Sequence, residues 1–467
     1  MGVKNLGIVI VDGVGYRNFV LSDFCIKASE AFEKLTIYSG LPAEVFSAYI
    51  SDTCEVIELP VFKEGKLTWL YRKLKEVAHM QKHKKKFYGI AMNLEKNRAT
   101  TYSKRSWLTR FAFIWTSLFN SEKNINHFYK KQKQSFSKNP VSIAYYQLLK
   151  ETKPDVLFFT HQRPPYLAPL DAMAKKLNIK TCSFIFSWDN LPSKGRMAAP
   201  FDSYVVWSDL MKEELHYFYP ETKNIKVSVV GTPQFEPYVL DTYFVEKTSF
   251  EARFNINPNL KTICYSCGDV STSKNDSLYV EVIAKAIDQR KIEPVNFIVR
   301  TSPAEDGVRF SDIKEQYPAI IWNFPQWTLT RENHPEPWSQ RVPESEDLRT
   351  LRSLLMYCDL NVNMCSTMGL DFMLFDKPVV NPVFGTPTNG LYNDGKYLKY
   401  GHYERVVAIG AVTIPRDEVA LVNEINFSLE NPLSRLEEQK ALLKLQIGKP
   451  LKGTSQRIIA ALKTARE

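Results

Sequence analysis

Asp12, His161 and Asp189 are side chains suited to acid–base chemistry, and each lies in a polar loop just after a short apolar run. Apolar runs of about five or six residues between polar loops are typical of buried strands in a parallel sheet. The carboxyl ends of parallel strands meet at one edge, so we expect the three side chains to converge there. Each is a candidate for the base that takes a proton from a hydroxyl group, and histidine titrates nearest neutral pH.

The same loops hold glycine, amide and cationic residues that suit ligand binding. They are Gly13, Arg17, Arg163, Asn190 and Lys194. Glycine lets the backbone approach a ligand closely, while amides and cations bind polar or anionic groups. We expect these residues to line the same cleft as the three candidate bases. A plain strand-to-helix turn after Asp12 agrees equally well with the sequence.

A second candidate site lies in the stretch 351–387. It reads as a helix end, a short strand over 360–363, a turn of small residues at 365–367 and a helix that opens at 368–369. A strand that leads through a small-residue turn into a helix presents backbone N–H groups and the positive end of the helix dipole to an anion. The stretch therefore predicts a diphosphate site.

The elements that position these residues form two α/β halves. Apolar segments alternate with helical patterns over 1–235 and again over 260–432, with a linker near 234–260, and 433–467 is helical. A chain of 467 residues is too long for one ordinary core. We expect two domains with a cleft between them, since domain interfaces favour ligand sites. The apolar run 406–412 predicts a further strand.

Positive charge is concentrated in one part of the chain, whose net charge is +10 overall. Residues 72–138 contain 17 Lys or Arg and three acidic residues, inside a segment, 63–144, that is helical and aromatic. Cations beside the Trp- and Phe-rich run 104–119 suit a helix in the headgroup region of an anionic membrane. A core helix with a solvated cationic neighbour is an alternative. We expect no nucleic-acid partner, because no known nucleic-acid motif is present.

Cysteine and histidine usage indicates no disulfide framework and no metal ion or other cofactor. The seven cysteines are scattered and odd in number, which is typical of reduced thiols. Cys264 and Cys267 lack a second pair, and His79 and His83 lie in a lysine-rich run rather than near carboxylates. With no signal-peptide pattern and no long apolar window, we expect a cytoplasmic protein, with peripheral association at the inner face of the plasma membrane as an option.

Four features of the second half belong together: the turn Arg300-Thr301-Ser302-Pro303, the helix 344–355, the turn Cys365-Ser366-Thr367 and the element from Asp371 to Pro378. They resemble the GT-B glycosyltransferases, particularly the bacterial enzymes of capsule- or O-antigen-type polysaccharide synthesis. In many such enzymes a glutamate lies seven positions before the proline and binds the donor ribose, and Asp371 has that spacing. This chain departs from the pattern by its shorter aspartate and by a serine where related proteins often have histidine.

The resemblance implies an α/β fold of two Rossmann-like domains facing a central cleft, with 63–144 as a helical insertion in the first. The acceptor-side domain would be 1–235, the donor domain 260–432, and the helices of 433–467 would return to the first domain. Donor binding would fall to Arg300, Ser366, Thr367, Gly369 and Asp371, with N–H groups at Met368 and Gly369 receiving the diphosphate. Gly268, in a small-residue loop, would line the cleft.

These features predict transfer of a sugar from a nucleotide-sugar donor to a bacterial surface-glycan acceptor, either a glycan or a lipid-linked glycan. Two alternatives share the fold: a polyol-phosphate transferase that uses a CDP-alcohol, and a nucleotide-sugar 2-epimerase. A third is a non-enzymatic scaffold that binds a partner or a membrane through the basic segment 72–138. The stereochemistry of transfer stays open at this point.

Overall fold

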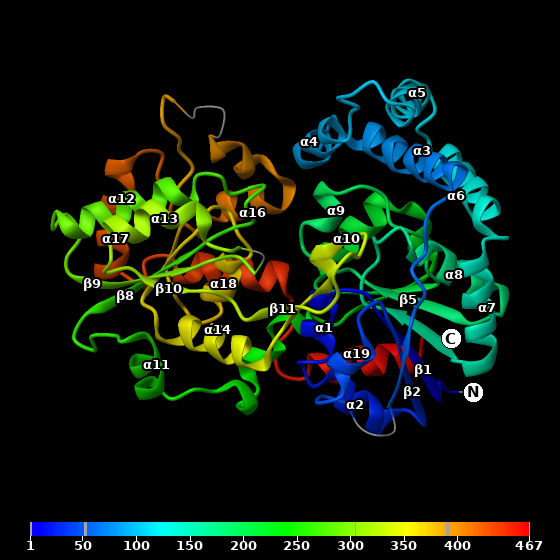
Figure 1. The fold of residues 1–467 in the computed structure, drawn as a ribbon, viewed down its shortest axis with the longest axis horizontal. Helices are drawn as coiled ribbons and strands as arrows, with labels where there is room; N and C mark the ends of the chain where they lie inside the picture. The colour runs from blue at the N-terminus through cyan, green and yellow to red at the C-terminus, as the bar shows by residue number, and fades with distance from the viewer. Residues whose placement is uncertain (1, 51–53, 304, 389–392, 467) are drawn as a thin grey trace. The chain divides into compact units, whose positions relative to one another are not determined.

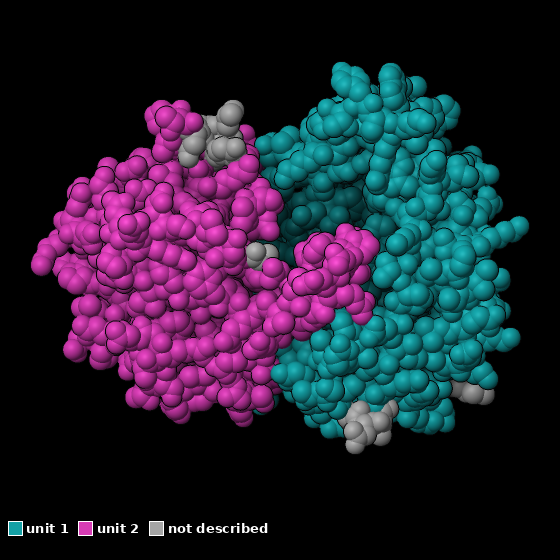
Figure 2. Space-filling model, in the orientation of Figure 1, with its two compact units in different colours: residues 1–236, 400–402, 446–467 teal, residues 237–399, 403–445 magenta. Residues whose placement is uncertain are grey.

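The computed structural model describes residues 2–50, 54–303, 305–388 and 393–466. The chain divides into two compact units (Figure 1, Figure 2). Unit 1 comprises residues 1–236, 400–402 and 446–467, and unit 2 comprises residues 237–399 and 403–445. Each unit is built on its own parallel sheet.

The sheet of unit 1 has seven parallel strands in the order β3-β2-β1-β4-β5-β6-β7. They are β1 (Asn5–Ile10), β2 (Lys34–Ser39), β3 (Cys54–Glu58), β4 (Val156–Phe159), β5 (Lys180–Phe184), β6 (Ser203–Val206) and β7 (Lys226–Val229). The order runs outward from β1 and β4 in opposite directions. Right-handed crossovers therefore place helices on both faces, and the direction reverses between β1 and β4.

Helices that follow the strands cover this sheet. They are α1 (Gly13–Phe19), α2 (Phe24–Ala31), α8 (Leu167–Lys176), α9 (Asn190–Ser193), α10 (Asp209–Phe218) and α19 (Thr454–Lys463). Buried aromatic rings hold the layers together: Phe19 packs edge-on against Phe158 at 5.4 Å and Phe184 at 5.5 Å. The last helix, α19, packs on α2. The core thus sits directly under the loops that leave β1 and β4.

Between β3 and β4 the chain forms a separate layer of helices. They are α3 (Lys66–His83), α4 (Tyr88–Lys96), α5 (Lys104–Leu118), α6 (Glu122–Phe136) and α7 (Pro140–Thr152). Leu74 and Ala78 of α3 pack with Ala112 of α5 and with Ile125 and Phe128 of α6. Helix α3 is thus the centre of the layer, and α5 lies at its outer side (Figure 1).

Unit 2 has five parallel strands in the order β10-β9-β8-β13-β14. They are β8 (Lys261–Ser266), β9 (Val295–Arg300), β10 (Ile321–Asn323), β13 (Leu360–Val362) and β14 (Val379–Val380), with an antiparallel pair β11 (Trp327–Leu329) and β12 (Arg341–Pro343) beside them. The direction of the order reverses between β8 and β13. This reversal repeats the arrangement of unit 1.

The helices of unit 2 carry its share of the core. They are α11 (Lys247–Phe254), α12 (Asp276–Asp288), α13 (Ser311–Gln316), α14 (Ser345–Tyr357), α15 (Met368–Met373), α16 (Gly401–Ile409), α17 (Glu418–Glu430) and α18 (Leu436–Gln446), where the first two residues of α16 belong to unit 1. Ile263, Tyr265 and Val299 of the strands pack with Ile283 of α12 and Leu421 of α17.

The strand expected over 406–412 is wrong, because most of that run is the end of α16. Tyr403 and Val406 are buried and lie three positions apart, which is one helical face. A short apolar run is ambiguous between a helix and a strand by periodicity alone. Just beyond the run, Thr413 forms an isolated parallel β-bridge with Val380.

All seven cysteines are free thiols, and six of them are buried. None of the helices in the described part of the chain combines the length and the apolar character that crossing a bilayer requires.

Candidate functional site

In unit 2, a ladder of buried amides holds the turn after β13. Asn363 Oδ1 accepts from the Ser366 N–H at 2.8 Å, and its Nδ2 donates to Asn361 Oδ1 at 2.6 Å. Asn361 Nδ2 donates to the Cys264 carbonyl at 2.9 Å, and Asn381 Nδ2 donates to the Asn363 carbonyl at 2.7 Å. All three amide side chains are fully buried. A buried amide without partners is costly, so the ladder fixes the turn against the sheet.

The turn itself presents hydroxyl groups. Cys365 has a left-handed backbone with φ of 49°, which reverses the chain sharply. Ser366 Oγ accepts from the Met368 N–H at 3.3 Å, and the Ser366 carbonyl accepts from the Gly369 N–H at 3.1 Å. The N–H groups expected to receive a diphosphate at Met368 and Gly369 are therefore used inside the turn. Ser366 and Thr367 are only half-buried, so the turn exposes side-chain hydroxyls instead.

Asp371 lies inside unit 2. Its side chain is 3% exposed, and the Tyr238 hydroxyl donates to its Oδ1. The Tyr238 hydroxyl thus occupies one oxygen of the carboxylate that was expected to bind a ribose.

Arg300 is also engaged within the protein. Its Nη2 lies 2.9 Å and 3.0 Å from the two oxygens of Asp347, and its Nη1 donates to Asn323 Oδ1. Asp347 further accepts from Trp327 Nε1 at 3.0 Å. Arg300 as a whole residue is 6% exposed, and its guanidinium links β9 to β10 and α14. The positive charge of Arg300, which was expected to bind a diphosphate, is therefore neutralised by Asp347.

The next two residues after Arg300 were missed by the sequence reasoning. Thr301 and Ser302 are buried, yet their hydroxyl oxygens have no hydrogen-bond partner among the described residues. A buried hydroxyl normally has a partner in the protein, in water or in a ligand. They follow β9 at the carboxyl edge of the sheet. The signal was present in the same four-residue turn, where only the arginine was considered.

Gly268 has a geometric role in the loop after β8. A Cβ at this position would lie 1.9 Å from Ser273 Oγ, so the loop has room only for glycine. The Gly268 N–H donates to Asp276 Oδ2 at 2.9 Å, and Arg309 Nη2 donates to the same oxygen at 3.0 Å. Tyr265 donates to Asp276 Oδ1 at 2.7 Å. Burial raises the pKa of Asp276 to about 7 despite these donors.

In unit 1, the structure brings Asp12 and His161 together where the strand order reverses. Asp12 Oδ1 caps α1 by accepting from the Gly15 N–H at 2.7 Å, and Oδ2 lies 3.0 Å from His161 Nδ1. The His161 ring stacks on Phe186 with centroids 3.9 Å apart. A carboxylate favours the proton on Nδ1, which leaves the lone pair on Nε2. The pair thus has the arrangement of a histidine base and its orienting carboxylate.

Asp189 is held differently. Although burial opposes it, Lys194 at 3.2 Å and His402 lower the pKa of Asp189 below its usual value. Asn190 Nδ2 donates to Asp189 Oδ1 at 2.9 Å. A carboxylate that is ionised and paired in this way binds protons weakly, so Asp189 is a poor candidate for the base.

Gln162 links these loops and was not predicted. Its Nε2 donates to Asn190 Oδ1 at 2.8 Å, and its Oε1 accepts from the Phe186 N–H at 3.1 Å. Of the other expected residues, Gly13 is the first residue of α1, and Arg17 Nη1 donates to the Gln234 carbonyl at 3.0 Å. Arg163 is half-buried, and its Nε has no hydrogen-bond partner among the described residues.

The expectation that His79 and His83 lie away from carboxylates is wrong. Ligand atoms of these residues and of Glu122 lie within 4.8 Å of one another. Lys82 and Arg196, however, bind the two Glu122 oxygens at 2.8 Å and 3.0 Å. Burial lowers the pKa of His83 to about 4. Burial also lowers the pKa of His79, and the neighbouring cations Arg196, Lys82 and Lys75 lower it further. The same cations would repel a metal ion, so we assign none to this cluster.

Comparison with known proteins shows which fold the chain has. No family model matches the sequence, and no curated protein matches it. Among solved structures, a glycosyltransferase from Rickettsia africae is 11% identical, with a TM-score of 0.52 and coverage of 99% of both chains. Arabidopsis thaliana UGT89C1 is 12% identical, with a TM-score of 0.52, and covers 98% of this chain and 99% of its own.

A third similar structure is the UDP-GlcNAc 2-epimerase from Neisseria meningitidis bound to UDP-GlcNAc. It is 11% identical, with a TM-score of 0.50, and the match covers 98% of this chain and 99% of that chain. The fold is GT-B. At such identities the likeness extends to the fold alone. In this GT-B chain the two reversal points, β1/β4 and β8/β13, are where the candidate groups gather.

We expect Asn363→Ala to lower the free energy of unfolding by about 2 kcal/mol or more, because buried partners on Asn361 and Ser366 would lose their hydrogen bonds. Urea unfolding followed by circular dichroism measures the change. Asn423→Ala, at an exposed position of α17, is the matched control and should change stability by less than about 0.5 kcal/mol. Equal stabilities of the two variants would show that the ladder does not hold the turn.

Asp276→Asn should alter the pH dependence of unfolding. The folded pKa of about 7 lies above the ordinary aspartate value of 3.8, so the protonated form of Asp276 is the one that stabilises the fold. It is present in full below about pH 4 and is lost as the pH rises through 7. Relative to Asp276→Asn, the wild type should lose up to about 1.4 kcal/mol per pH unit between pH 5 and 7. Urea titrations at pH 5, 6, 7 and 8 measure this difference, and parallel profiles would contradict it; exposed Asp312→Asn is the control.

Proposed function

We propose that this protein is an inverting, nucleotide-sugar-dependent glycosyltransferase whose base is His161. The observation that carries the proposal is the pair formed by His161 Nδ1 and Asp12 Oδ2 at 3.0 Å, at the reversal point of the unit 1 sheet. The GT-B fold, shared with a glycosyltransferase from Rickettsia africae, supports it. A base that deprotonates an acceptor is needed for direct displacement at a sugar carbon.

In the proposed reaction, His161 Nε2 takes the proton of the acceptor hydroxyl as its oxygen attacks the anomeric carbon of the donor. The bond from that carbon to the diphosphate oxygen breaks, and the nucleoside diphosphate leaves with the electron pair. Asp12 stabilises the imidazolium that forms, as the carboxylate does in a catalytic triad. One displacement inverts the configuration of the sugar carbon.

We propose that unit 2 binds the donor at its own reversal point. The half-buried hydroxyls of Ser366 and Thr367 supply hydrogen bonds to the diphosphate, together with the hydroxyls of Thr301 and Ser302, which have no partner among the described residues. Asp371 is our candidate for the ribose hydroxyls, with Tyr238 as the partner it would exchange. Arg300 is left out of this set because Asp347 occupies its guanidinium.

The acceptor that we propose is a bacterial surface glycan, either free or linked to lipid, of the capsule or O-antigen type. Arg163 lies two positions after His161, and its Nε, which has no hydrogen-bond partner within the described ranges, suits an anionic group on such an acceptor. A lipid-linked acceptor would place the protein in the cytoplasm, peripheral to the inner face of the plasma membrane. The basic and aromatic segment 63–144 supports that location.

A nucleotide-sugar 2-epimerase is the second candidate, because one similar structure is an epimerase with UDP-GlcNAc bound. The two activities differ in their need for an acceptor. Incubation with UDP-GlcNAc alone, followed by NMR of the sugar, separates them. Formation of the 2-epimer without an acceptor would replace the transferase proposal by the epimerase.

Donor binding is tested by titration calorimetry with UDP, GDP, CMP and CDP compounds. We expect one nucleoside diphosphate to bind and the double variant Ser366→Ala/Thr367→Val to weaken its Kd about tenfold, since two hydrogen bonds to a charged group are lost. Thr248→Ala, which removes an exposed hydroxyl of α11, should leave Kd unchanged. If none of these nucleotides binds to the wild type, the proposed donor class is wrong.

His161→Ala should lower turnover with donor and acceptor by about 10²- to 10⁴-fold while nucleotide affinity stays the same. Asp12→Asn is a sharper test, because asparagine also caps helices well and the cap of α1 should persist. Its amide would donate to Nδ1 and reverse the tautomer of His161, so turnover should fall with little loss of stability. The control is His127→Ala, at an exposed position of α6. Full turnover in Asp12→Asn would remove the pair from the mechanism.

A further inference from the structure

The ring of His161 is contacted from two directions. Asp12 Oδ2 meets its edge, 3.0 Å from Nδ1. Phe186 covers one of its faces, with centroids 3.9 Å apart and ring planes only 14° from parallel. One hydrogen bond fixes the position of one ring atom but leaves the ring able to turn about that atom. The stacked face removes this freedom, so the two contacts together set the direction in which Nε2 points.

Phe186 lies in the loop beyond the end of β5. One position earlier, the Ile185 N–H still donates to the Val205 carbonyl of β6 at 3.1 Å. The Phe186 N–H donates instead to a side chain, Gln162 Oε1, at 3.1 Å. A buried or half-buried backbone N–H needs such an acceptor once the sheet has ended. Gln162 therefore takes over from the sheet at the residue whose ring stacks on His161.

Gln162 is itself held in one orientation. It is 1% exposed, its Nε2 donates to Asn190 Oδ1 at 2.8 Å, and its carbonyl accepts from the Ala198 N–H at 3.0 Å. A buried amide whose donor and acceptor are both used loses both hydrogen bonds if it turns over. Gln162 thus joins the loop after β5 to the loop after β4, directly beside His161 in the sequence.

A stacked aromatic ring also favours the charged form of histidine. The face of a phenyl ring carries negative charge density and attracts a cation that lies within about 6 Å of the ring centre. The centre of the His161 ring is 3.9 Å from that of Phe186. Phe186 therefore stabilises the imidazolium that forms when His161 takes a proton, and Asp12 stabilises the same charge from the edge. Both neighbours favour the product of proton transfer.

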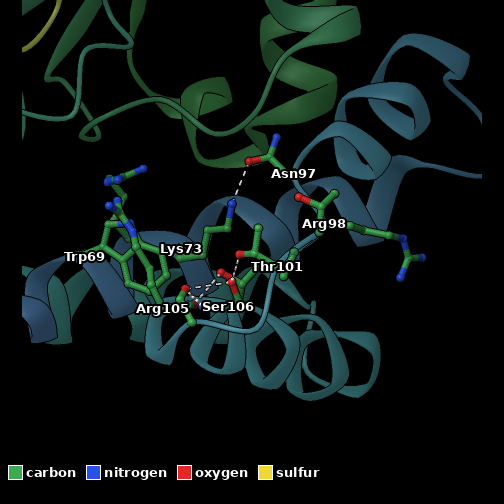
Figure 3. Close-up of a pocket in the computed structure, with 12 residues that line it drawn as sticks. Trp69, Lys73, Asn97, Arg98, Thr101, Arg105 and Ser106 are labelled. Carbon is green, nitrogen blue, oxygen red and sulfur yellow. Dashed lines mark hydrogen bonds between the residues drawn. The ribbon is translucent and has the colours of Figure 1, made fainter.

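A polar pocket elsewhere in unit 1 offers no comparable group. It has a volume of about 450 Å³ and lies between α3, α5 and the loop that joins α4 to α5 (Figure 3). Its side chains bond to one another: Lys73 Nζ donates to Asn97 Oδ1 at 2.7 Å, and Ser106 Oγ lies 2.7 Å from Thr101 Oγ1. None of the described residues that line it is histidine, aspartate or glutamate. A hydroxyl bound there would meet neither an imidazole nor a carboxylate, so this pocket does not replace the edge at His161 as the place of proton transfer.

We propose that Phe186 and Gln162 are positioning residues of the His161 base. Phe186 fixes the plane of the imidazole and stabilises the imidazolium, and Gln162 holds Phe186 in place against the ring. Both residues act through His161. The proposal rests on the proposed function, in which His161 takes the proton of the acceptor hydroxyl, and it adds the two groups that keep Nε2 directed toward that proton.

Nitrogen-15 NMR of the histidine rings in the full chain tests the orientation of His161 without donor or acceptor. The chain has seven histidines, and His161→Ala identifies the signals of this one. At about pH 8, where an ordinary imidazole is neutral, the wild type should show a single tautomer with the proton on Nδ1. In Phe186→Leu and Gln162→Met the ring gains freedom at its contact with Asp12, so the His161 shifts should move toward the average of the two tautomers. Signals identical to those of the wild type in both variants would overturn the proposal.

Turnover with donor and acceptor is the second readout. Phe186→Leu keeps an apolar side chain but removes the ring, so kcat should fall about tenfold or more while KM for the donor stays within about twofold. Phe186→Tyr keeps the ring face and should retain most of the wild-type kcat. Gln162→Met conserves volume, loses both side-chain hydrogen bonds and should resemble Phe186→Leu. Equal losses of kcat in Phe186→Leu and Phe186→Tyr would show that the ring face has no part in the reaction, and would overturn the role of the stack.

Two matched variants control for lost packing. Phe244→Leu removes a partly exposed ring of unit 2 that has a cation over its face. Gln439→Met removes a buried amide of α18 that donates to two backbone carbonyls. Neither control should change kcat or the His161 signals. Circular dichroism and urea unfolding show whether each variant folds, and Phe186→Leu alone decides the proposal if Gln162→Met does not fold.

A double-mutant cycle separates this role from a merely structural one. Because Phe186 acts through His161, Phe186→Leu should cause no further loss of turnover in a His161→Ala background. Full additivity of the two losses would overturn the proposal. If the wild type transfers sugar from no donor, the proposed function is wrong, whereas the NMR measurement still shows whether Phe186 orients His161. Normal transfer with unchanged His161 signals in Phe186→Leu would overturn the positioning role only.

Discussion

The reversal of strand order in each sheet is the constraint on which the candidate sites depend. Crossovers that start from β1 and β4 leave in opposite directions, so the loops after these strands diverge and expose the strand ends between them. Asp12 and His161 sit in those two loops, which explains how residues 149 positions apart meet at 3.0 Å. The same reversal between β8 and β13 places the turn at Ser366 at an open edge of unit 2.

Buried polar groups then separate structural residues from candidate ligand contacts. The amides of Asn361, Asn363 and Asn381 satisfy one another, and Arg300 is satisfied by Asp347. These groups stabilise the fold, and most of their donors and acceptors are already used within the protein. Thr301 and Ser302 are buried at the same sheet edge, and their hydroxyls have no hydrogen-bond partner in the described part of the chain, so a ligand or a water molecule can supply one.

Strand ends were visible in the sequence, and side-chain partners were not. Asp12 and His161 could be placed together because apolar runs mark strands and parallel strands share one edge. Nothing in the sequence pairs Arg300 with Asp347, which lies 47 positions later, or Asp371 with Tyr238, 133 positions earlier. Likewise the composition of α5 indicated an apolar helix with cations, but only packing reveals which face is turned to solvent.

The helical layer is tied to the loop of the candidate base by a short series of hydrogen bonds. Lys75 of α3, the helix on which α5 packs, is buried and donates to the carbonyls of Met197 at 3.0 Å and Ala198 at 2.7 Å. The Ala198 N–H donates in turn to the Gln162 carbonyl at 3.0 Å, and Gln162 adjoins His161.

Because burial lowers the pKa of Lys75 to about 7, its ammonium is costly at this position, and the two carbonyls offset that cost by accepting its hydrogens. A side chain held under such conditions leaves α3 little freedom relative to residues 197–198. Under the proposed peripheral location, a membrane bound by the segment 63–144 would then orient unit 1, including the Asp12–His161 pair, with respect to that membrane. For an acceptor linked to lipid, this orientation would set which of its hydroxyl groups comes within reach of His161.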